Sequence, residues 1–190
     1  MGILQGRSMN APLNENGLAQ AAAFYDYYYH HHFDGLFHSE LVRTKQTIQQ
    51  FIDQGINTKI DSRIDEINWG DYEGRTPTDE TKAYYHTTVN MWRSGVLNHQ
   101  PSGGESVMEL SHRVSAFLLD LNKIEQKSTF LICSHGRTIK AMLCFLTRTP
   151  LTQMDYFNHK NTSLYIVENG AITLQCSTLH LDAAGVYCIE

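Results

Sequence analysis

The chain has 190 residues, 42% of them hydrophobic, and a formal net charge of -5 at pH 7. This length suffices for one well-buried core and is short for two, so we expect a single domain over residues 1–190. The 15 Lys and Arg residues are too thinly spread for a nucleic-acid surface or an anionic membrane, and we expect neither partner.

The N-terminal stretch from Met1 to Leu13 is expected to be a loop, because no periodic element precedes it. Asn14 can cap a helix that runs to about Tyr29. One face of this helix carries Leu18, Ala22 and Tyr25. His30 to His32 follow, but adjacent helical residues point about 100° apart, so we do not expect them to share one metal ion.

Two strands of the first half each end at a polar turn or loop. Gly35 to His38 is a short strand candidate, and a helix starting at Ser39 places Arg43 on its first turn. Asn57 to Ile60 is a weaker strand, followed by a long polar loop that contains Glu66. Loops of this length in a compact domain are uncommon unless they are functional.

Two helices in the middle of the chain have clear starting points. Thr78 is expected to start a helix with a buried stripe of Tyr85, Val89 and Trp92. Ser106 is expected to cap a longer helix whose apolar residues recur at helical spacing as far as Ile124.

The segment from Ser128 to Thr147 predicts a strand, a tight turn and a helix. Thr129 to Cys133 is an unbroken apolar and β-branched run, typical of a strand that is buried on both faces. His135 follows in the turn, and ligands of α/β sheets bind beyond such strand ends, where helix N-termini present free N–H groups. The alternative is a structural turn in which Ser134 caps the helix and His135 is an ordinary buried polar residue.

A hairpin is expected near the C-terminus, with strands from Ser163 to Glu168 and from Ala171 to Ser177 around Asn169-Gly170. The tail from Thr178 has no strong signal. Alternating strands and helices predict the α/β class, as a three-layer α/β/α fold with a mostly parallel central sheet. The four cysteines have no metal-binding spacing and no apolar run reaches the length of a membrane span, so we expect a cytoplasmic protein.

Three residues at the predicted strand ends suit phosphoryl transfer. Arg43 can grip two phosphate oxygens, His135 can donate to a third, and Glu66 can protonate the leaving oxygen. This set contains no nucleophile.

Four collinear motifs carry a family resemblance: SELVRTKQT, DEINWGDYEG, SGGES and ICSHGRTIKAML. Together they resemble the histidine phosphatase superfamily, also called phosphoglycerate mutase-like. The resemblance covers nearly the whole chain and implies a phosphoglycerate mutase-like fold and a phosphohistidine intermediate. It gives catalytic roles to His135, Arg43 and Glu66, and it implies a small phosphorylated metabolite as substrate, with no cofactor and no metal. The substrate-binding residues that it implies are Gln5, Gly6, Gly136 and Glu105.

The chain departs from the family in one respect. The family opens with a strand ending in Arg-His-Gly, which supplies the nucleophilic histidine, and no such motif occurs in these 190 residues. We therefore expect an N-terminally incomplete domain in which Met1 is an internal methionine, and an inactive or nearly inactive chain. The sheet edges left open favour a homodimer.

Other interpretations remain open on the sequence. A phosphoglycerate mutase-type phosphotransferase and a non-catalytic phosphate-binding pseudophosphatase share the same motifs. Cys133 and Arg137 faintly resemble the Cys-x5-Arg loop of cysteine-dependent phosphatases, but only three residues separate them. His38 is the nearest substitute for the nucleophile and is not expected to fill that role.

Overall fold

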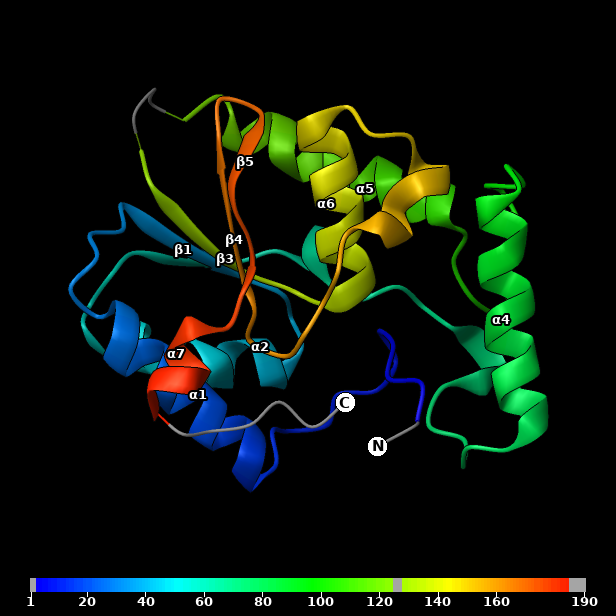
Figure 1. Ribbon diagram of the computed structural model, residues 1–190, viewed down its shortest axis with the longest axis horizontal. Helices are drawn as coiled ribbons and strands as arrows, with labels where there is room; N and C mark the ends of the chain where they lie inside the picture. The colour runs from blue at the N-terminus through cyan, green and yellow to red at the C-terminus, as the bar shows by residue number, and fades with distance from the viewer. Residues whose placement is uncertain (1–2, 125–127, 185–190) are drawn as a thin grey trace.

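Three parallel strands form the centre of the structure, a computed structural model that describes residues 3–124 and 128–184 (Figure 1). Strand β1 (Gly35–His38) lies between β2 (Thr58–Ile60) and β3 (Phe130–Cys133). All four residues of β1 are buried, as expected of an inner strand of this sheet. Because the strands are parallel, their carboxyl ends meet at one edge of the sheet.

Strand β3 was predicted to be buried on both faces, and this prediction is wrong. Only Leu131 of its four residues is fully buried. The reason is that β3 pairs with β1 along one edge, and no strand within residues 3–124 and 128–184 pairs with its other edge. An apolar run indicates that a strand is suited to burial, but it does not show that a neighbour is present on both sides.

The predicted hairpin is present as a separate antiparallel sheet of β4 (Leu164–Glu168) and β5 (Ala171–Ser177). Asn169 and Gly170 form its turn with φ of 52° and 79°. Positive φ at both central residues is what a tight type I′ turn requires, and Asn-Gly accepts it readily. Figure 1 shows the hairpin at a steep angle to β1 and β3.

Helices lie on both sides of the parallel sheet, which confirms the predicted α/β layering (Figure 1). Their bounds are α1 (Glu15–Tyr28), α2 (Val42–Thr47), α3 (Gln49–Asp53), α4 (Asp79–Arg93), α5 (Val107–Leu121), α6 (Gly136–Thr147) and α7 (Leu179–Ala184). Phe37 of β1 packs in a core with α4, α5 and α6, whereas its neighbour Leu36 packs with α1 and α3. Successive residues of a strand face opposite sides, so one short strand serves both cores. Short 3-10 turns occupy η1 (Ser62–Ile64), η2 (Gly70–Tyr72) and η3 (Leu151–Tyr156).

The predicted helix starts are confirmed by their caps. Asn14 Oδ1 accepts a hydrogen bond from Gly17 N at 2.8 Å, and Thr78 and Ser106 each form a capping box. These caps satisfy N–H groups that have no partner inside a helix.

Other local predictions need correction. The helix predicted from Ser39 is broken at Ile48, whose φ of -111° separates α2 from α3. Leu18 is 47% exposed, and α1 instead buries a face that includes Phe24 and Tyr28. This helix is rich in Ala and Tyr on several sides, so its sequence pattern does not identify the buried face.

The apolar repeat of α5 was expected to reach Ile124, but the helix ends at Leu121 and Ile124 is 38% exposed. Helix α7 was not predicted. Met1 lies outside the described residues. No helix in the described part of the chain is long and apolar enough to cross a membrane.

Candidate active site

A contact between a half-buried arginine and a buried histidine lies at the carboxyl edge of the parallel sheet. Arg43, on the first turn of α2, donates from Nε to His135 Nδ1 at 3.2 Å. Its Nη1 and Nη2 donate to the carbonyl oxygens of Met9 at 2.6 Å and Gly6 at 3.3 Å. A guanidinium has five N–H groups, so two remain without a hydrogen-bonding partner among the described residues and are available to an anion.

His135 is the N-cap residue of α6 and is only 7% exposed. Because Nδ1 accepts from Arg43, the ring proton is on Nε2, which donates to Ser39 Oγ at 2.8 Å. Burial is the main cause that lowers the pKa of His135 to about 2, and the nearby Arg43, Arg113 and His159 contribute to the same shift. The imidazole is therefore neutral, and the arginine is the positive charge of the site.

Glu66 is held against the first turn of α6, next to His135. Its Oε1 accepts from the main-chain N–H groups of Ile67 at 2.9 Å and Thr138 at 3.2 Å, and its Oε2 accepts from Arg137 N at 3.3 Å. Burial raises the pKa of Glu66, and these hydrogen bonds partly oppose the rise. Its side chain is fixed, and its raised pKa suits a carboxylic acid that gives up a proton.

The structure therefore brings together the three residues that the sequence places at strand ends. Arg43 contacts His135 directly. The Glu66 carboxylate accepts hydrogen bonds from the main-chain N–H groups of Arg137 and Thr138. Their chemical roles stay predictions, but their meeting at one edge of the sheet is an observed geometry.

The predicted substrate-binding glycines are positions where the chain passes close to other atoms. A Cβ on Gly6 would clash with the Glu73 carboxylate and lie 2.5 Å from the Ile67 carbonyl oxygen. A Cβ on Gly136 would lie 3.1 Å from His159 Cδ2. Gln5 is exposed beside this segment. A role for these residues in binding substrate stays a prediction.

Glu105 is fully engaged with Arg113 of α5. Arg113 Nε and Nη2 donate to the two carboxylate oxygens of Glu105 at 2.7 and 2.9 Å, and each side chain is only 13% exposed. The same guanidinium donates to the carbonyl oxygens of Arg63, Asp65 and Glu66 at 2.7 to 3.1 Å. In this geometry Glu105 acts on the site through Arg113, which holds the loop that presents Glu66.

Replacing Arg113 with alanine is expected to lower the free energy of unfolding by about 3–5 kcal/mol, because a nearly buried Glu105 loses its partner. Urea denaturation measures this change. Lys123→Ala is the matched control, because Lys123 pairs with Asp120 in solvent, with side chains 76% and 52% exposed. A loss below about 1 kcal/mol in Arg113→Ala would contradict the role given to this pair.

Sequence reasoning missed several residues of this network. Ser39 is fully buried and links His135 to Thr44 Oγ1 at 2.8 Å, although the sequence marks it only as a helix-starting residue. Glu73 accepts from Trp69 N and Ser8 N, both at 2.8 Å, and so joins the N-terminal segment to the polar loop that carries Glu66. His159 follows η3, and no local pattern connects it to Gly136.

The two rival nucleophiles do not fit the geometry. Desolvation raises the pKa of the Cys133 thiol to about 12, so little thiolate is present at neutral pH. The Arg137 guanidinium turns away to Asp155 at 2.7 Å and Tyr85 Oη at 2.6 Å. His38 is 3% exposed and its Nδ1 lies 2.7 Å from the Ser39 carbonyl oxygen.

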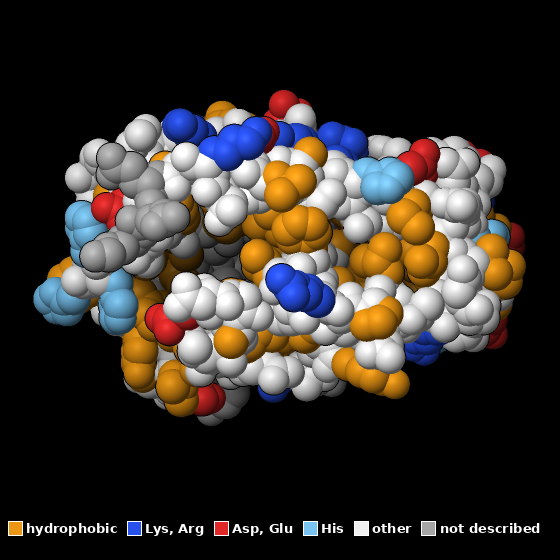
Figure 2. Space-filling model, turned by 90° about the horizontal axis from the view of Figure 1, so that it is seen from above, with side chains coloured by type: hydrophobic (Ala, Val, Ile, Leu, Met, Phe, Trp, Pro, Cys, Tyr) orange, Lys and Arg blue, Asp and Glu red, His pale blue; other side chains and the backbone are white. Residues whose placement is uncertain are grey.

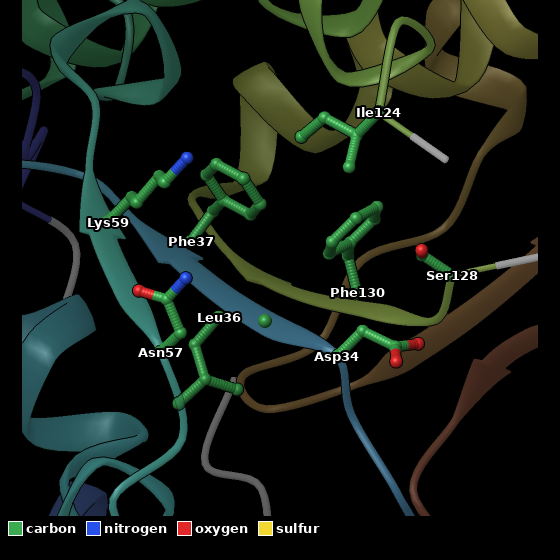
Figure 3. Close-up of a pocket in the computed structure, with 9 residues that line it drawn as sticks. Asp34, Leu36, Phe37, Asn57, Lys59, Ile124, Ser128 and Phe130 are labelled. Carbon is green, nitrogen blue, oxygen red and sulfur yellow. The ribbon is translucent and has the colours of Figure 1, made fainter. Parts of the chain in front are cut away.

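A cavity of about 260 Å³ lies at the opposite edge of the sheet, away from this site (Figure 3). Its walls come from the amino ends of the strands, with Asp34 and Gly35 at β1, Asn57 and Lys59 at β2, and Phe130 at β3. The charged residues of the predicted chemistry are at the carboxyl ends, so we do not assign the reaction to this cavity. No group of three or more His, Cys, Asp or Glu side chains in the described residues could hold a metal ion.

A parallel sheet between helix layers, with charged side chains at its carboxyl edge, is the arrangement of α/β proteins that bind ligands there. Residues 1–180 match the family model of the histidine phosphatase superfamily (branch 1), and the chain belongs to this superfamily. This result confirms the resemblance on which the sequence analysis relied.

Known relatives include both phosphatases and mutases. Phosphoserine phosphatase 1 of Hydrogenobacter thermophilus is 26% identical over 160 residues, which cover 84% of this chain and 75% of that protein. A 2,3-bisphosphoglycerate-dependent phosphoglycerate mutase 2 of Gloeobacter violaceus is 26% identical, over 77% of this chain and 69% of its own. The crystal structure of a mutant phosphoserine phosphatase from Entamoeba histolytica, in complex with phosphoserine, has a TM-score of 0.79 and 28% identity, and the match covers 95% of this chain and 91% of that one. The phosphoglycerate mutase-like fold and a phosphatase or mutase-like function are thus supported.

Proposed function

We propose that this chain carries the phosphate-binding and proton-transfer groups of a phosphate monoester hydrolase that works through a phosphohistidine. The observation that supports this proposal is the meeting of Arg43, His135 and Glu66 at one edge of the sheet. Two N–H groups of Arg43 have no hydrogen-bonding partner among the described residues. Each can donate to one phosphate oxygen, because the planar guanidinium presents its donors side by side.

In the proposed reaction, a histidine nitrogen attacks phosphorus while the bond from phosphorus to the leaving oxygen breaks. Glu66 gives its proton to that oxygen, so an alcohol departs and a phosphohistidine remains. Glu66, now a carboxylate, then takes a proton from water as the water oxygen attacks phosphorus. The phosphorus–nitrogen bond breaks, phosphate leaves, and both the histidine and the protonated Glu66 are restored.

The nucleophilic histidine is proposed to lie on a strand outside these 190 residues. The second edge of β3 is unpaired among the described residues, and three of its four apolar residues are only partly buried. A further strand added along this edge would cover them and pair the main-chain groups that an edge strand leaves open. Its carboxyl end, if parallel to β3, would bring a histidine to the edge where His135 and Arg43 stand.

The substrate is proposed to be a small phosphorylated metabolite. The names of the relatives include phosphoserine and phosphoglycerate as ligands or substrates of those proteins. Cys133, Cys144 and Cys176 are all unpaired, which is compatible with the proposed cytoplasmic location. The homodimer stays a prediction.

The test compares this chain with the native gene product that includes any preceding residues, here called the extended protein. We expect the extended protein to release phosphate from a panel of monoesters, also in the presence of a chelator, and the 190-residue chain to be at least about a thousandfold slower. Equal turnover by the two proteins would contradict the missing nucleophile.

Two other outcomes would replace the proposal. A native product with an intact mass of 21.7 kDa that binds phosphate without turnover would be a non-catalytic phosphate-binding protein. Transfer of the phosphoryl group to a second hydroxyl group, without release to water, would identify a mutase.

A further inference from the structure

Arg137, on the first turn of α6, has a buried guanidinium with partners on two other elements. Its Nη1 donates to Asp155 Oδ1 of η3 at 2.7 Å, and its Nη2 donates to Tyr85 Oη of α4 at 2.6 Å. The residue is only 7% exposed, unlike the Lys and Arg side chains that stand on the molecular surface in Figure 2. A buried charge must be paired and hydrogen-bonded, so these two contacts fix the side chain. Neither the family match nor the reaction proposed above assigns a role to it.

Three aromatic rings surround the same guanidinium. Its carbon Cζ lies 5.9 Å from the centroid of the Trp69 ring, 5.6 Å from that of Tyr85 and 6.0 Å from that of Trp92. A cation within about 6 Å of a ring centroid is attracted to the ring face, most strongly to that of tryptophan. Trp69 is buried and belongs to the polar loop that carries Glu66. The guanidinium therefore contacts this loop as well as α4 and η3.

Asp155 can hold Arg137 in place because two further cations fix its carboxylate. Its Oδ1 also accepts from Lys140 Nζ at 3.0 Å, and its Oδ2 accepts from Arg93 Nε at 3.1 Å. Burial alone would raise the pKa of Asp155, but Arg137 and these two cations lower it, so the group is a carboxylate at neutral pH. Removing the Arg137 charge would leave Asp155 with two partners, and no acid would be left unpaired.

The main chain of Arg137 connects this cluster to Glu66. Arg137 N donates to Glu66 Oε2 at 3.3 Å, and Thr138 N donates to Oε1 at 3.2 Å. Among the described residues that donate to this carboxylate, only Arg137 has a charged side chain. His135, the neutral N-cap residue of α6, lies at the start of the same turn. One residue thus joins the Glu66 carboxylate to α4 and η3.

We propose that Arg137 is a positioning residue for Glu66: its guanidinium fixes the first turn of α6, and the main-chain N–H groups of that turn hold the carboxylate. The inference rests on the proposed function and adds a residue to its proton-transfer step. Displacement of this turn would lengthen the hydrogen bonds to Glu66. Burial raises the pKa of Glu66 and those bonds lower it, so longer bonds give a higher pKa.

Arg137→Met tests the inference, because methionine packs well between aromatic rings and carries no charge. Carbon NMR titration of isotopically labelled glutamate side chains in the 190-residue chain measures the pKa of Glu66 without turnover, and Glu66→Gln identifies its signal. We expect a pKa about one pH unit higher than in the parent chain, the effect of losing one hydrogen bond to a charged group.

The same variant of the extended protein provides a kinetic readout. The alkaline limb of its pH profile should move to higher pH by the same shift. Its turnover number should fall about tenfold, because the proton donor is misplaced. Its affinity for inorganic phosphate should stay at the parent value, since Arg43 is untouched. A variant that is merely less stable would not move the alkaline limb.

Asp155→Asn separates positioning from the direct effect of charge. The substitution removes a negative charge, and through space alone this change would stabilise the Glu66 carboxylate and lower its pKa. Release of Arg137 from its partner acts in the opposite direction, and we expect the Glu66 pKa to rise here too. Arg43 and Arg113 also lie near Glu66, and both are unchanged in every variant.

Arg93→Gln is the matched control, because it removes an equal charge from Asp155 at a side chain that is 54% exposed. It should keep the Glu66 pKa and the turnover number of the parent. A Glu66 pKa that does not rise in Asp155→Asn, an unchanged pKa in Arg137→Met, or an equal rise in Arg93→Gln would overturn the inference. If Arg137→Met fails to fold, Asp155→Asn decides alone. The expected pKa shifts with no turnover by the extended protein would contradict only the proposed hydrolysis.

Discussion

Replacing Glu66 with glutamine is expected to lower the turnover number of the extended protein by a factor of about 10² to 10⁴, the usual contribution of a positioned general acid. The glutamine has the same shape and its oxygen can still accept from Ile67 N and Thr138 N. It cannot give up a proton to a leaving alcohol, so the loss should be in the chemical step and not in phosphate affinity. Steady-state kinetics together with calorimetric titration separate the two.

The pH dependence provides a second readout for Glu66. Burial raises its pKa, so the acid form persists to higher pH, and activity that needs the proton falls as pH rises through that pKa. The alkaline limb of the pH profile should therefore be absent from Glu66→Gln. For the same reason the contribution of Glu66 to stability is present at low pH and is lost as pH rises.

The control for this substitution is Glu168→Gln, an equally small change on the exposed end of β4. It should retain the turnover and the pH profile of the parent. Full activity in Glu66→Gln would remove Glu66 from the reaction.

Replacing Arg43 with alanine is expected to weaken the binding of inorganic phosphate to the 190-residue chain by about a hundredfold. Two charged hydrogen bonds at about 1.5 kcal/mol each give a loss of about 3 kcal/mol. Arg43→Lys keeps the charge and loses the planar pair of donors. Its affinity for phosphate should therefore lie between that of the parent chain and that of Arg43→Ala. Titration followed by phosphorus NMR or calorimetry measures all three proteins.

Lys45→Ala is the matched control for Arg43, because Lys45 is on the same helix and points to solvent. Removing Arg43 also removes a positive charge that lowers the pKa of His135. We expect the remaining phosphate affinity of Arg43→Ala to change more with pH than that of the parent chain. Equal phosphate affinity in parent and variant would show that the anion binds elsewhere.

The sequence was most informative where the signal is local. The start of α5 follows from Ser106 and a strict apolar repeat, and the hairpin follows from Asn169-Gly170 between apolar runs. Arg43 and His135 could be placed together because each follows a strand of the same parallel sheet.

Contacts between distant segments could not be predicted in the same way. Arg113 looks like a surface charge on a helix, and its role depends on carbonyl groups 47 to 50 residues earlier in the chain. The edge position of β3 was missed for a related reason, because hydrophobicity reports what a strand can bury and not which neighbours it has.

The contact between Arg43 and His135 joins segments 92 residues apart, so an unfolded chain has no equivalent of this anion site. Any anion that binds there must favour the native state by mass action, by about 2.7 kcal/mol at a concentration of 100 times its dissociation constant. Thermal melting in graded phosphate can therefore detect occupancy of the site without any measurement of turnover. For the same reason, the melting temperature of the purified protein should be higher in a phosphate buffer than in a buffer without a binding anion.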